Sequence, residues 1–517
     1  MRFGKSENQG PVRGIFSTLT TGIIAMLVVF GVMFSSVSVF AHHPAEPREK
    51  QLHRAGLKVQ WFTQAGIGVS GKLIDWDYFV DENRSTTYFE VAGGDYSETF
   101  SQFDIGPNGK PFGIEGGSTY AKLRQEIVAA ELASKLGKQV DVSITQYAQP
   151  QTVLYTLTSG ALVRALDGET GETLWKVIVD DPNVECFGVA ASDTYVAVAA
   201  GNKIHCLDSE TGKLLWSKAC RGIISAPPAV VENQIYVPLF NGQLERFNVR
   251  TKGFNSTAYV SSGQVRTRPM VTPLTVSWGT EGGDFNVGSR FRRRATMGFQ
   301  LKTGKPVVSQ PAYEDRTYFV GSRNGFLYSI DELTGRVNWD VSTGGSISQA
   351  PFVLGEHVFV INDRNEMHKF NRPNGIIAEG WDQPRPNVAS FLGASKSSVF
   401  VFDKFGMLEV RDRDSGTVVA SADVGNVMKT LPHLKSDRLF VANKSGTIRC
   451  IREIASSRPY FHDDEMVVKP NMAEDKPAAE GDKPKGDPNN PFENNPFDQG
   501  GNEKTPEPDT SNPFDGG

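Results

Sequence analysis

An arginine cluster is the part of this 517-residue chain with the clearest capacity to bind an anion. Its members are Arg290, Arg292, Arg293 and Arg294. Arg266 and Arg268 precede the cluster in a region patterned as strands. Guanidinium groups bind phosphate and carboxylate groups through charge and paired hydrogen bonds. The spacing predicts an anion- or partner-binding patch, or a solvated loop that balances acidic neighbours, and we favour the loop.

No other residue set predicts catalysis or metal binding. His42, His43 and His53 lie in a polar, charged stretch, in which solvated histidines are far commoner than metal ligands. We therefore assign no catalytic, cofactor-binding or metal-binding residue and no cofactor, and we expect the chain not to be an enzyme. The formal net charge of −5 argues against nucleic acid as a partner.

The C-terminal residues 463–517 form an acidic tail rich in proline and asparagine, a composition typical of disorder. The tail contains three Asn-Pro-Phe motifs, whose candidate docking residues are Asn490, Phe492, Asn495, Phe497, Asn512 and Phe514. Repeated motifs on a flexible tail suit multivalent docking. The alternative is low-complexity drift, which we favour slightly.

The N-terminus is patterned as a targeting segment. Three basic residues precede an uncharged run over 14–41, which is most apolar over 23–34. Small residues before His42 fit a cleavage site, so we predict a signal peptide over 1–41. The alternative is an uncleaved signal anchor, a transmembrane helix that would tether the protein to the membrane through 14–41. Either form predicts export, and residues 42–56 are interpreted as a linker.

Export bears on the four cysteines, because disulfides form in oxidising compartments. The cysteines are Cys186, Cys206, Cys220 and Cys450. Cys206 and Cys220 flank one predicted strand and could form a disulfide. Buried free thiols are the alternative, and we favour it.

The stretch over 165–175 recurs along the chain. Asp167 can accept N–H groups two residues on, Gly171 can adopt the positive φ of a tight turn, and Trp175 lies on the next strand. Similar stretches occur at 208–216 and 331–339. We predict that the turn residues and tryptophans dock neighbouring repeats. They are Trp61, Asp167, Gly171, Trp175, Asp208, Gly212, Trp216, Asp331, Gly335 and Trp339.

A hairpin turn recurs every 40–42 residues through the same region. The turn positions are Gly160, Gly201, Gly242, Gly283, Gly325, Asn365, Gly406 and Gly446. A period near 41 with four strand-like pieces is typical of a β-propeller blade. We predict an all-β fold with eight four-stranded blades over 57–453.

The two ends of the repeat region complete each other. The last repeat stops without a tryptophan turn, whereas residues 58–62 form a strand without a repeat. We predict that this N-terminal strand completes the eighth blade and closes the ring, which removes two open sheet edges.

An insertion over 78–150 interrupts the first blade and predicts a small α+β segment. Its helix is expected over 118–137, with an apolar stripe and Gly137 as the C-cap. The stripe consists of Leu123, Ile127, Val128, Leu132 and Leu136. The insertion is predicted either to shape a binding face or to act as a cap without function.

The full motif at 165–175 reads Ala-x-Asp-x-x-Thr-Gly-x-x-x-Trp, and the other two copies match all but its first position. This pattern resembles the PQQ-like (WD40-like) β-propeller repeat family. That family includes quinoprotein alcohol and sugar dehydrogenases, and also non-catalytic propellers of the outer-membrane-assembly type. The resemblance implies the propeller fold, and the tryptophans in it dock blades and do not bind quinone.

Several departures favour the non-catalytic members of the family. No two cysteines are adjacent, whereas many family alcohol dehydrogenases have an adjacent pair. No acidic calcium-binding set beside a catalytic aspartate can be assigned. We expect an exported scaffold in the periplasm or cell envelope that binds unidentified envelope proteins. The alternatives are a PQQ-dependent quinoprotein oxidoreductase and a polyanion- or polysaccharide-binding propeller that uses the arginine cluster.

Overall fold

The computed structural model describes residues 47–462 apart from 68–70 and 253–255. The predicted signal segment, His42, His43 and the tail with its Asn-Pro-Phe motifs lie outside the described residues. Within the described ranges, no helix is both long enough and apolar enough to span a bilayer.

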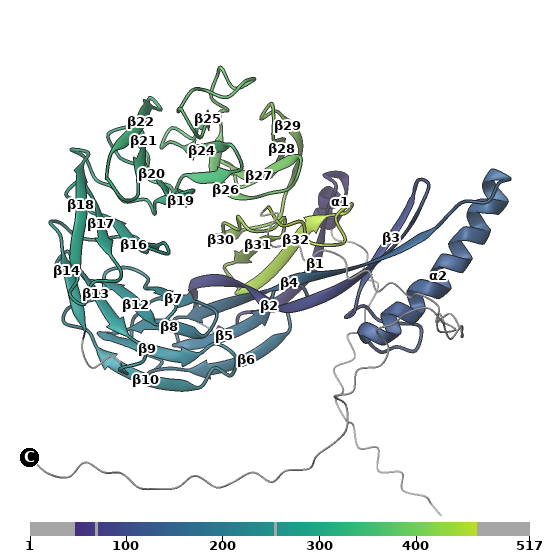
Figure 1. Ribbon diagram of the computed structural model, residues 1–517, viewed down its shortest axis with the longest axis horizontal. Coiled ribbons are helices and arrows are strands. Elements are labelled where there is room, and N and C mark those ends of the chain that lie inside the picture. Colours follow the sequence, from purple (N-terminus) through teal and green to yellow (C-terminus); the bar gives the residue numbers. More distant parts are fainter. Residues whose placement is uncertain (1–46, 68–70, 253–255, 463–517) are drawn as a thin grey trace, which may run out of the picture. The chain divides into compact units, whose positions relative to one another are not determined.

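Eight antiparallel sheets form a ring, each running from a first strand near the centre to a last strand at the rim (Figure 1). The first blade contains β2 (Leu73–Gly93), β4 (Ser143–Thr158), β5 (Leu162–Asp167) and β6 (Thr173–Ile178), with β3 (Tyr96–Ser101) added beside β2. The second contains β7 (Cys186–Ala191), β8 (Tyr195–Ala200), β9 (Lys203–Asp208) and β10 (Leu214–Ala219). The third contains β11 (Ala229–Val231), β12 (Gln234–Pro238), β13 (Gln243–Asn248) and β14 (Thr257–Val260). The fourth contains β15 (Met270–Val271), β16 (Thr275–Gly279), β17 (Asp284–Ser289) and β18 (Thr296–Lys302).

The remaining blades follow the same order. The fifth contains β19 (Ala312–Glu314), β20 (Thr317–Gly321), β21 (Phe326–Asp331) and β22 (Val337–Ser342). The sixth contains β23 (Phe352–Leu354), β24 (His357–Ile361) and β25 (Met367–Asn371), and an isolated bridge between Phe370 and Ile377 replaces its fourth strand. The seventh contains β26 (Val388–Ala394), β27 (Ser398–Asp403), β28 (Leu408–Asp412) and β29 (Val418–Ala422). The eighth contains β30 (Val427–Leu431), β31 (Leu439–Asn443), β32 (Thr447–Glu453) and β1 (Leu57–Gln64).

Strand β1 closes the ring as predicted. It pairs antiparallel with β32 from Leu57 opposite Glu453 to Gln64 opposite Thr447. The eighth sheet therefore takes its outermost strand from the N-terminal end of the described chain. The pairing leaves no open first or last blade, so the sheet edges that an open array would expose are covered.

Tryptophan side chains link consecutive blades. Trp61 Nε1 donates a hydrogen bond to Gly168 O at 2.8 Å, and a Cβ added at Gly171 would lie 2.5 Å from the Trp61 ring. Gly171 thus needs both its positive φ of 72° and its missing side chain. Equivalent bonds run from Trp175 to Ser209 O at 2.8 Å and from Trp339 to Arg372 O at 3.0 Å. In contrast, the buried Nε1 of Trp216 has no hydrogen-bond partner among the described residues.

Helix α1 (Pro47–Arg54) departs from the linker predicted over 42–56. Leu52 is only 2% exposed and packs in one apolar cluster with Leu57, Ala422 and Leu439. The seventh blade has Ala420 where several other blades have a tryptophan, and Ala420 borders the same cluster. The helix therefore fills apolar volume between the seventh and eighth blades, which the polar composition of this stretch did not reveal.

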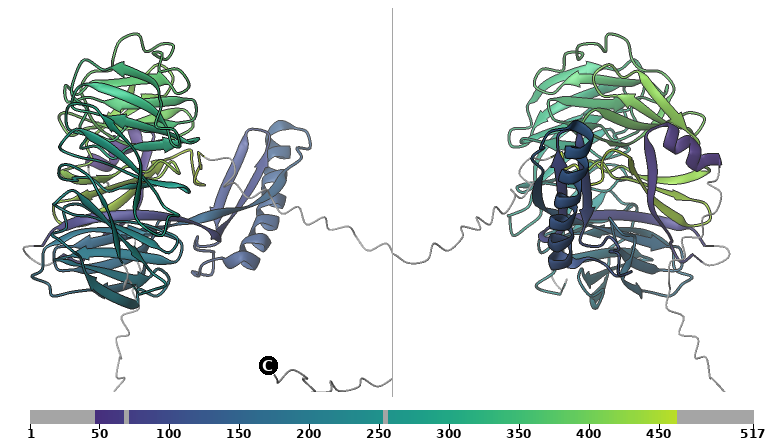
Figure 2. Two further views of the ribbon diagram at one scale, coloured as in Figure 1. Left: turned by 60° about the vertical axis from the view of Figure 1, so that its left-hand side comes forward. Right: turned by 90° about the vertical axis from the view of Figure 1, so that its right-hand side faces the viewer.

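The insertion extends the first blade into an arm, which we define as residues 82–150 (Figure 2). Strands β2 and β4 pair up to Asp81 opposite Gln151, pass through an irregularity, and pair again from Ser85 opposite Pro150 outward. Strand β3 lies beside β2, and helix α2 (Gly113–Leu136) packs on this small sheet through an apolar core of its own.

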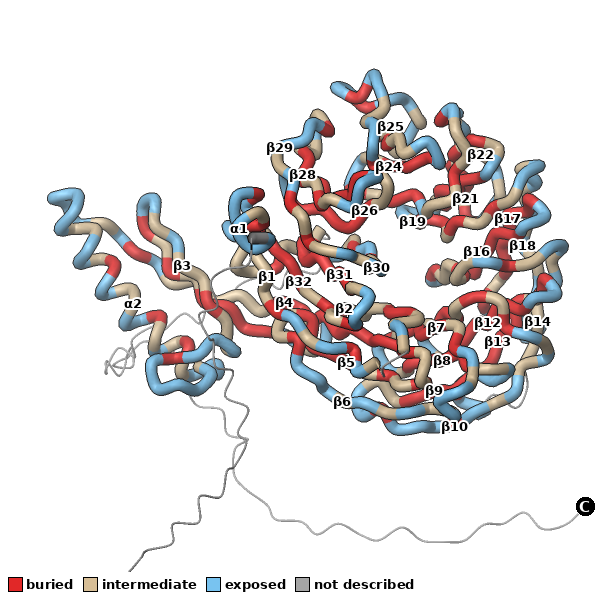
Figure 3. The backbone as a smooth tube through the Cα atoms, turned by 180° about the vertical axis from the view of Figure 1, so that it is seen from behind, coloured by how far each residue is buried: buried red, intermediate tan, exposed pale blue. Residues whose placement is uncertain are grey.

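The helix packs through only two residues of the predicted stripe, Val128, which is buried, and Leu132, which packs against the same apolar core. Gly117, Ala121 and Val128 are buried, whereas Leu123, Ile127 and Leu136 are exposed. Any side chain at position 117 would clash with the ring of Phe89, so small residues let the helix approach the sheet closely. The outer side of α2 is correspondingly exposed in Figure 3.

Excising the arm is expected to leave a folded propeller. Replacing residues 82–150 with Asn-Gly would join Asp81 to Gln151, which already face each other, through a two-residue hairpin loop. The hydrogen bond from Tyr88 to Glu169 and the exposed Arg84–Glu210 pair would be lost. We expect denaturant unfolding to show a loss of about 1–2 kcal/mol. Failure of this variant to fold would show instead that the arm is part of the propeller core.

His433 makes the stability of the fold depend on pH. It is buried, its ring contacts Tyr78 and Phe440 edge-on, and its Nε2 accepts a hydrogen bond from Ser436 N. Burial lowers its pKa from 6.5 to about 3, with the charges of His462 and Arg438 adding to the effect. The unfolded histidine takes up a proton below pH 6.5, whereas the folded one stays neutral until about pH 3.

The stabilisation from neutral His433 is therefore complete above pH 6.5 and is lost as the pH falls towards 3. At pH 5 the loss is roughly 2 kcal/mol. Unfolding free energies of the parent chain and His433→Gln should be compared at pH 7 and pH 5. We expect the drop between the two pH values to be smaller in the variant by about that amount, and an identical drop would contradict the assignment.

Candidate functional site

Two adjoining cavities lie where the seventh and eighth blades meet the first and second blades. The first is about 540 Å³ and is lined by Ser390, Phe402, Phe405, Gly406, Met407, Asp423, Gly425, Asn426, Val427, Met428 and Thr430. The second is about 680 Å³ and is lined by Lys72, Leu73, Ile74, Ser159, Asn183, Val184, Glu185, Cys186, Met428, Lys429, Ala442, Asn443 and Lys444. Met428 lines both, and we call the two cavities together the groove. The groove lies on the face formed by the turns between second and third strands.

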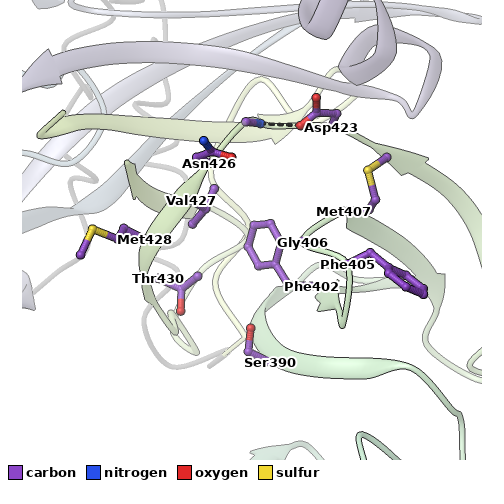
Figure 4. A pocket seen from close by; sticks show the side chains of 11 residues that line it. Ser390, Phe402, Phe405, Gly406, Met407, Asp423, Asn426, Val427, Met428 and Thr430 are labelled. Atoms are coloured by element: carbon purple, nitrogen blue, oxygen red, sulfur yellow. Dashed lines mark hydrogen bonds between the residues drawn. The ribbon is translucent and has the colours of Figure 1, made fainter. Parts of the chain in front are cut away.

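The first cavity is positioned by two short connections (Figure 4). In the turn from β27 to β28, Asp403 Oδ1 accepts hydrogen bonds from Phe405 N and Met407 N, both at 2.8 Å. This turn holds Phe405 outward, where it is 77% exposed. On the connection from β29 to β30, Asp423 bonds Arg48 of α1 at 3.2 Å. The result is a cavity with Phe and Met side chains on its wall.

The second cavity carries lysines from two blades. Lys72 precedes β2 in the first blade, whereas Lys429 and Lys444 belong to the eighth blade. Lys429 Nζ donates a hydrogen bond to Ile74 O and lies 3.7 Å from Asp75 Oδ1. Burial lowers the pKa of Lys429, while Asp75 acts in the opposite direction.

An ion cluster lies directly beneath the groove. Arg268 bonds Asp75 at 2.9 Å and Asp77 at 2.7 Å, so it joins the fourth blade to the first. The same two carboxylates accept hydrogen bonds from Val189 N and Ala191 N of the second blade, both at 3.1 Å. Burial raises the pKa of Asp77, against the effect of Arg268. The cluster therefore ties the first strands of the first and second blades to the segment that enters the fourth blade.

The predicted arginine patch is wrong for Arg290. Its side chain is 1% exposed, donates hydrogen bonds to Thr272 O and Pro273 O, and lies 3.3 Å from Glu232. Its fourth-blade position at the end of β17 directs it inward, which spacing alone did not show. It is a structural residue and is not available to an external anion.

The rest of the predicted patch is dispersed. The loop backbone at Arg292 is held by Arg246, whose Nη2 donates to Arg292 O at 3.0 Å. Arg266 pairs with Glu281 at 2.8 Å, and Arg268 belongs to the ion cluster. Only the side chains of Arg292, Arg293 and Arg294 remain exposed at the loop. Of the six arginines in the predicted polyanion-binding patch, Arg266, Arg268 and Arg290 are therefore already paired with carboxylates within the protein.

The cysteines form no disulfide within the part of the chain that the structure describes. Cys206 is buried, and burial raises its pKa to about 12. Cys220 is partly buried, and burial raises its pKa to a similar value. Across the same described residues, no group of three or more His, Cys, Asp and Glu side chains is arranged to hold a metal ion.

Sequence reasoning missed the groove. Its residues come from Ser159, Ser390 and five separate segments within 72–74, 183–186, 402–407, 423–430 and 442–444, which no local pattern connects. The one signal available was Phe405, an aromatic residue directly before a turn glycine.

The family profile described as outer membrane protein assembly factor BamB matches residues 159–253 and 278–475, more than half of the chain. The chain belongs to this family. The matched residues begin after the arm. BamB from Moranella endobia (strain PCIT) is 23% identical over 356 residues, which cover 63% of this chain and 90% of that protein. BamB from Shewanella oneidensis (strain MR-1) is 23% identical over 420 residues, which cover 76% of this chain and 88% of that protein.

Among solved structures, the crystal structure of BamB from Moraxella catarrhalis aligns with a TM-score of 0.49 and 16% sequence identity. That alignment covers 58% of this chain and 91% of the BamB chain.

Proposed function

We propose that this chain is an exported, non-catalytic β-propeller scaffold that holds envelope proteins together during the assembly of outer membrane proteins. The observation that carries the proposal is the match to the BamB family over most of the ring. The BamB relatives are named as outer membrane protein assembly factors, and the proposal brings that role to this chain.

The physical features of the ring support a scaffold. Strand pairing at β1, docked indoles and the Arg268 ion cluster link blades that are distant in sequence. Such a ring keeps its shape while the loops and the arm vary, and loops on rigid frames commonly carry binding residues. We assign partner binding to the groove and the arm. The tail motifs at 490–497 and 512–514 and the exposed Arg292–Arg294 loop are secondary candidates.

Crosslinking in intact envelopes tests this proposal. A tagged full-length chain would be crosslinked in its own cells and purified under denaturing conditions, and captured proteins would be identified by mass spectrometry. We expect enrichment of outer membrane assembly proteins and, after gene deletion, a lower abundance of outer membrane β-barrel proteins. Recovery of the chain without any envelope partner, together with an unchanged outer membrane, would contradict the proposal.

The described residues do not fit a quinone and calcium site. Asp75 and Asp77, two carboxylates on the first strand of the first blade, are bonded to Arg268 and to backbone N–H groups. The Oδ2 atom of each carboxylate is therefore already bonded to a cation and a backbone N–H group, whereas calcium needs several free oxygens at once. Incubation with PQQ and calcium is expected to give no stoichiometric quinone binding and no dye-linked alcohol oxidation. Bound quinone with turnover would establish the oxidoreductase alternative.

A further inference from the structure

The groove combines two different chemistries. Its first cavity exposes apolar side chains, with Phe405 77% and Met428 60% exposed although both are large and hydrophobic. Exposed apolar side chains that border a cavity commonly mark a binding site. Methionine can adapt its shape to different apolar partners. The first cavity is therefore suited to one large apolar side chain.

The second cavity has an excess of positive charge. Lys72, Lys429 and Lys444 line it, and Glu185 is the one carboxylate among its lining residues. Asp75 lies 3.7 Å from Lys429 and offsets part of that charge from below. Lys444 is exposed on the turn between β31 and β32, where it can reach a ligand from above.

We propose that the groove binds an acidic peptide segment of a partner protein, with one large apolar side chain in the first cavity and carboxylates at the lysines of the second. The proposal rests on the scaffold function and specifies the partner segment. Charge complementarity selects this occupant: a basic segment would be repelled at Lys72 and Lys444, and a neutral apolar one would leave these lysines without partners. Because Met428 lies between the cavities, the apolar residue and the carboxylates must be close in the partner sequence.

Fluorescence anisotropy with a labelled Glu-Asp-Phe-Asp-Glu-Asp peptide tests the proposal on the full chain. In the first control peptide, Gln and Asn replace the Glu and Asp residues. In the second, Ser replaces Phe. We expect the acidic aromatic peptide to bind about tenfold more tightly than either control, and salt to weaken its binding. Equal binding of the three peptides, or no binding of the first, would overturn the proposal.

Matched variants locate the site. Lys444→Glu and Met428→Asp change exposed residues of the groove and are expected to weaken binding at least tenfold. Lys396→Glu changes an exposed lysine on the turn between β26 and β27, on the opposite face, and should bind as the parent chain does. Thermal unfolding checks that all three remain folded. Equal binding by Lys444→Glu and Lys396→Glu would overturn the proposal.

The two proposals fail in different ways. If envelope crosslinking recovers assembly proteins but the peptide does not bind, the groove assignment is wrong and the scaffold function stands. If the peptide binds at the groove but no envelope partner is captured, the groove is a peptide site and the assembly function is wrong.

Discussion

Replacing Arg438 with methionine is expected to lower the free energy of unfolding by about 3–5 kcal/mol. Arg438 is fully buried, and its guanidinium bonds Glu169 at 3.0 Å and Asp437 at 3.0 Å. Methionine fills part of the volume but leaves both carboxylates in the interior without their cation. An uncompensated buried charge is among the most destabilising changes that one substitution can cause.

We expect Arg438→Met to destabilise the structure beyond the eighth blade, because its partner Glu169 also accepts hydrogen bonds from two other parts of the chain. It accepts hydrogen bonds from Gln60 on the closing strand at 3.0 Å and from Tyr88 at the base of the arm at 3.2 Å. Burial, with the charge of Glu169 beside it, raises the pKa of Tyr88 well above its ordinary value. Arg438 thus joins the last blade, the first blade and the arm through a single carboxylate.

Arg372→Met is the matched control for Arg438→Met. Arg372 also pairs with two carboxylates, Asp315 at 2.6 Å and Glu356 at 3.1 Å, but both partners are exposed. Exposed pairs contribute about 1 kcal/mol or less. Denaturant unfolding followed by circular dichroism would compare the two variants, and equal losses would refute the role assigned to Arg438.

Trp61→Ala is expected to cost about 3–5 kcal/mol and to release the closing strand. The indole is 8% exposed, packs near Phe440, and bonds Gly168 O of the first blade. Its loss removes apolar burial and a hydrogen bond at the seam between the two ends of the ring. We expect limited proteolysis to cut within 57–64 in the variant under conditions that leave the parent chain intact.

A disulfide between the closing strand β1 and its neighbour β32 provides the rescue experiment. Phe62 and Arg449 face each other on β1 and β32, and Phe62 is exposed, so cysteines at both positions would join the strands. When these two cysteines are added to Trp61→Ala, we expect the variant to be protease-resistant under oxidising conditions and to become sensitive again on reduction. Protection that does not depend on oxidation would show that opening of the seam is not the cause of the cleavage.

Much of the fold could be predicted because its determinants are local or periodic. Asp167 accepts hydrogen bonds from Glu169 N at 2.9 Å and Thr170 N at 2.8 Å within one turn. A few consecutive residues are therefore enough to predict this turn. The repeat period then sets the number of blades, and the missing strand of the last repeat indicates the closing strand. These features depend on spacing along the chain, which is visible without coordinates of any neighbour.

The prediction failed where burial is set by residues distant in sequence. Arg290 seemed exposed within a run of charges, yet carbonyl groups of the same blade surround it. Residues 47–54 had the composition of a linker, yet Leu52 fills the space beside Ala420. The apolar stripe of α2 predicted Val128 and Leu132 correctly but its other members wrongly, because small residues such as Gly117 form part of the packed side.

The sequence by itself determined the eight-bladed ring, its turn chemistry and its closure, because each follows from backbone hydrogen bonds and a constant period. Only the tertiary structure decided which side chains form the groove. Lys72, Phe405 and Lys444 belong to different blades, and their proximity depends on how the ring closes. A repeat fixes where each blade begins, whereas a binding surface depends on the residues in which neighbouring blades differ.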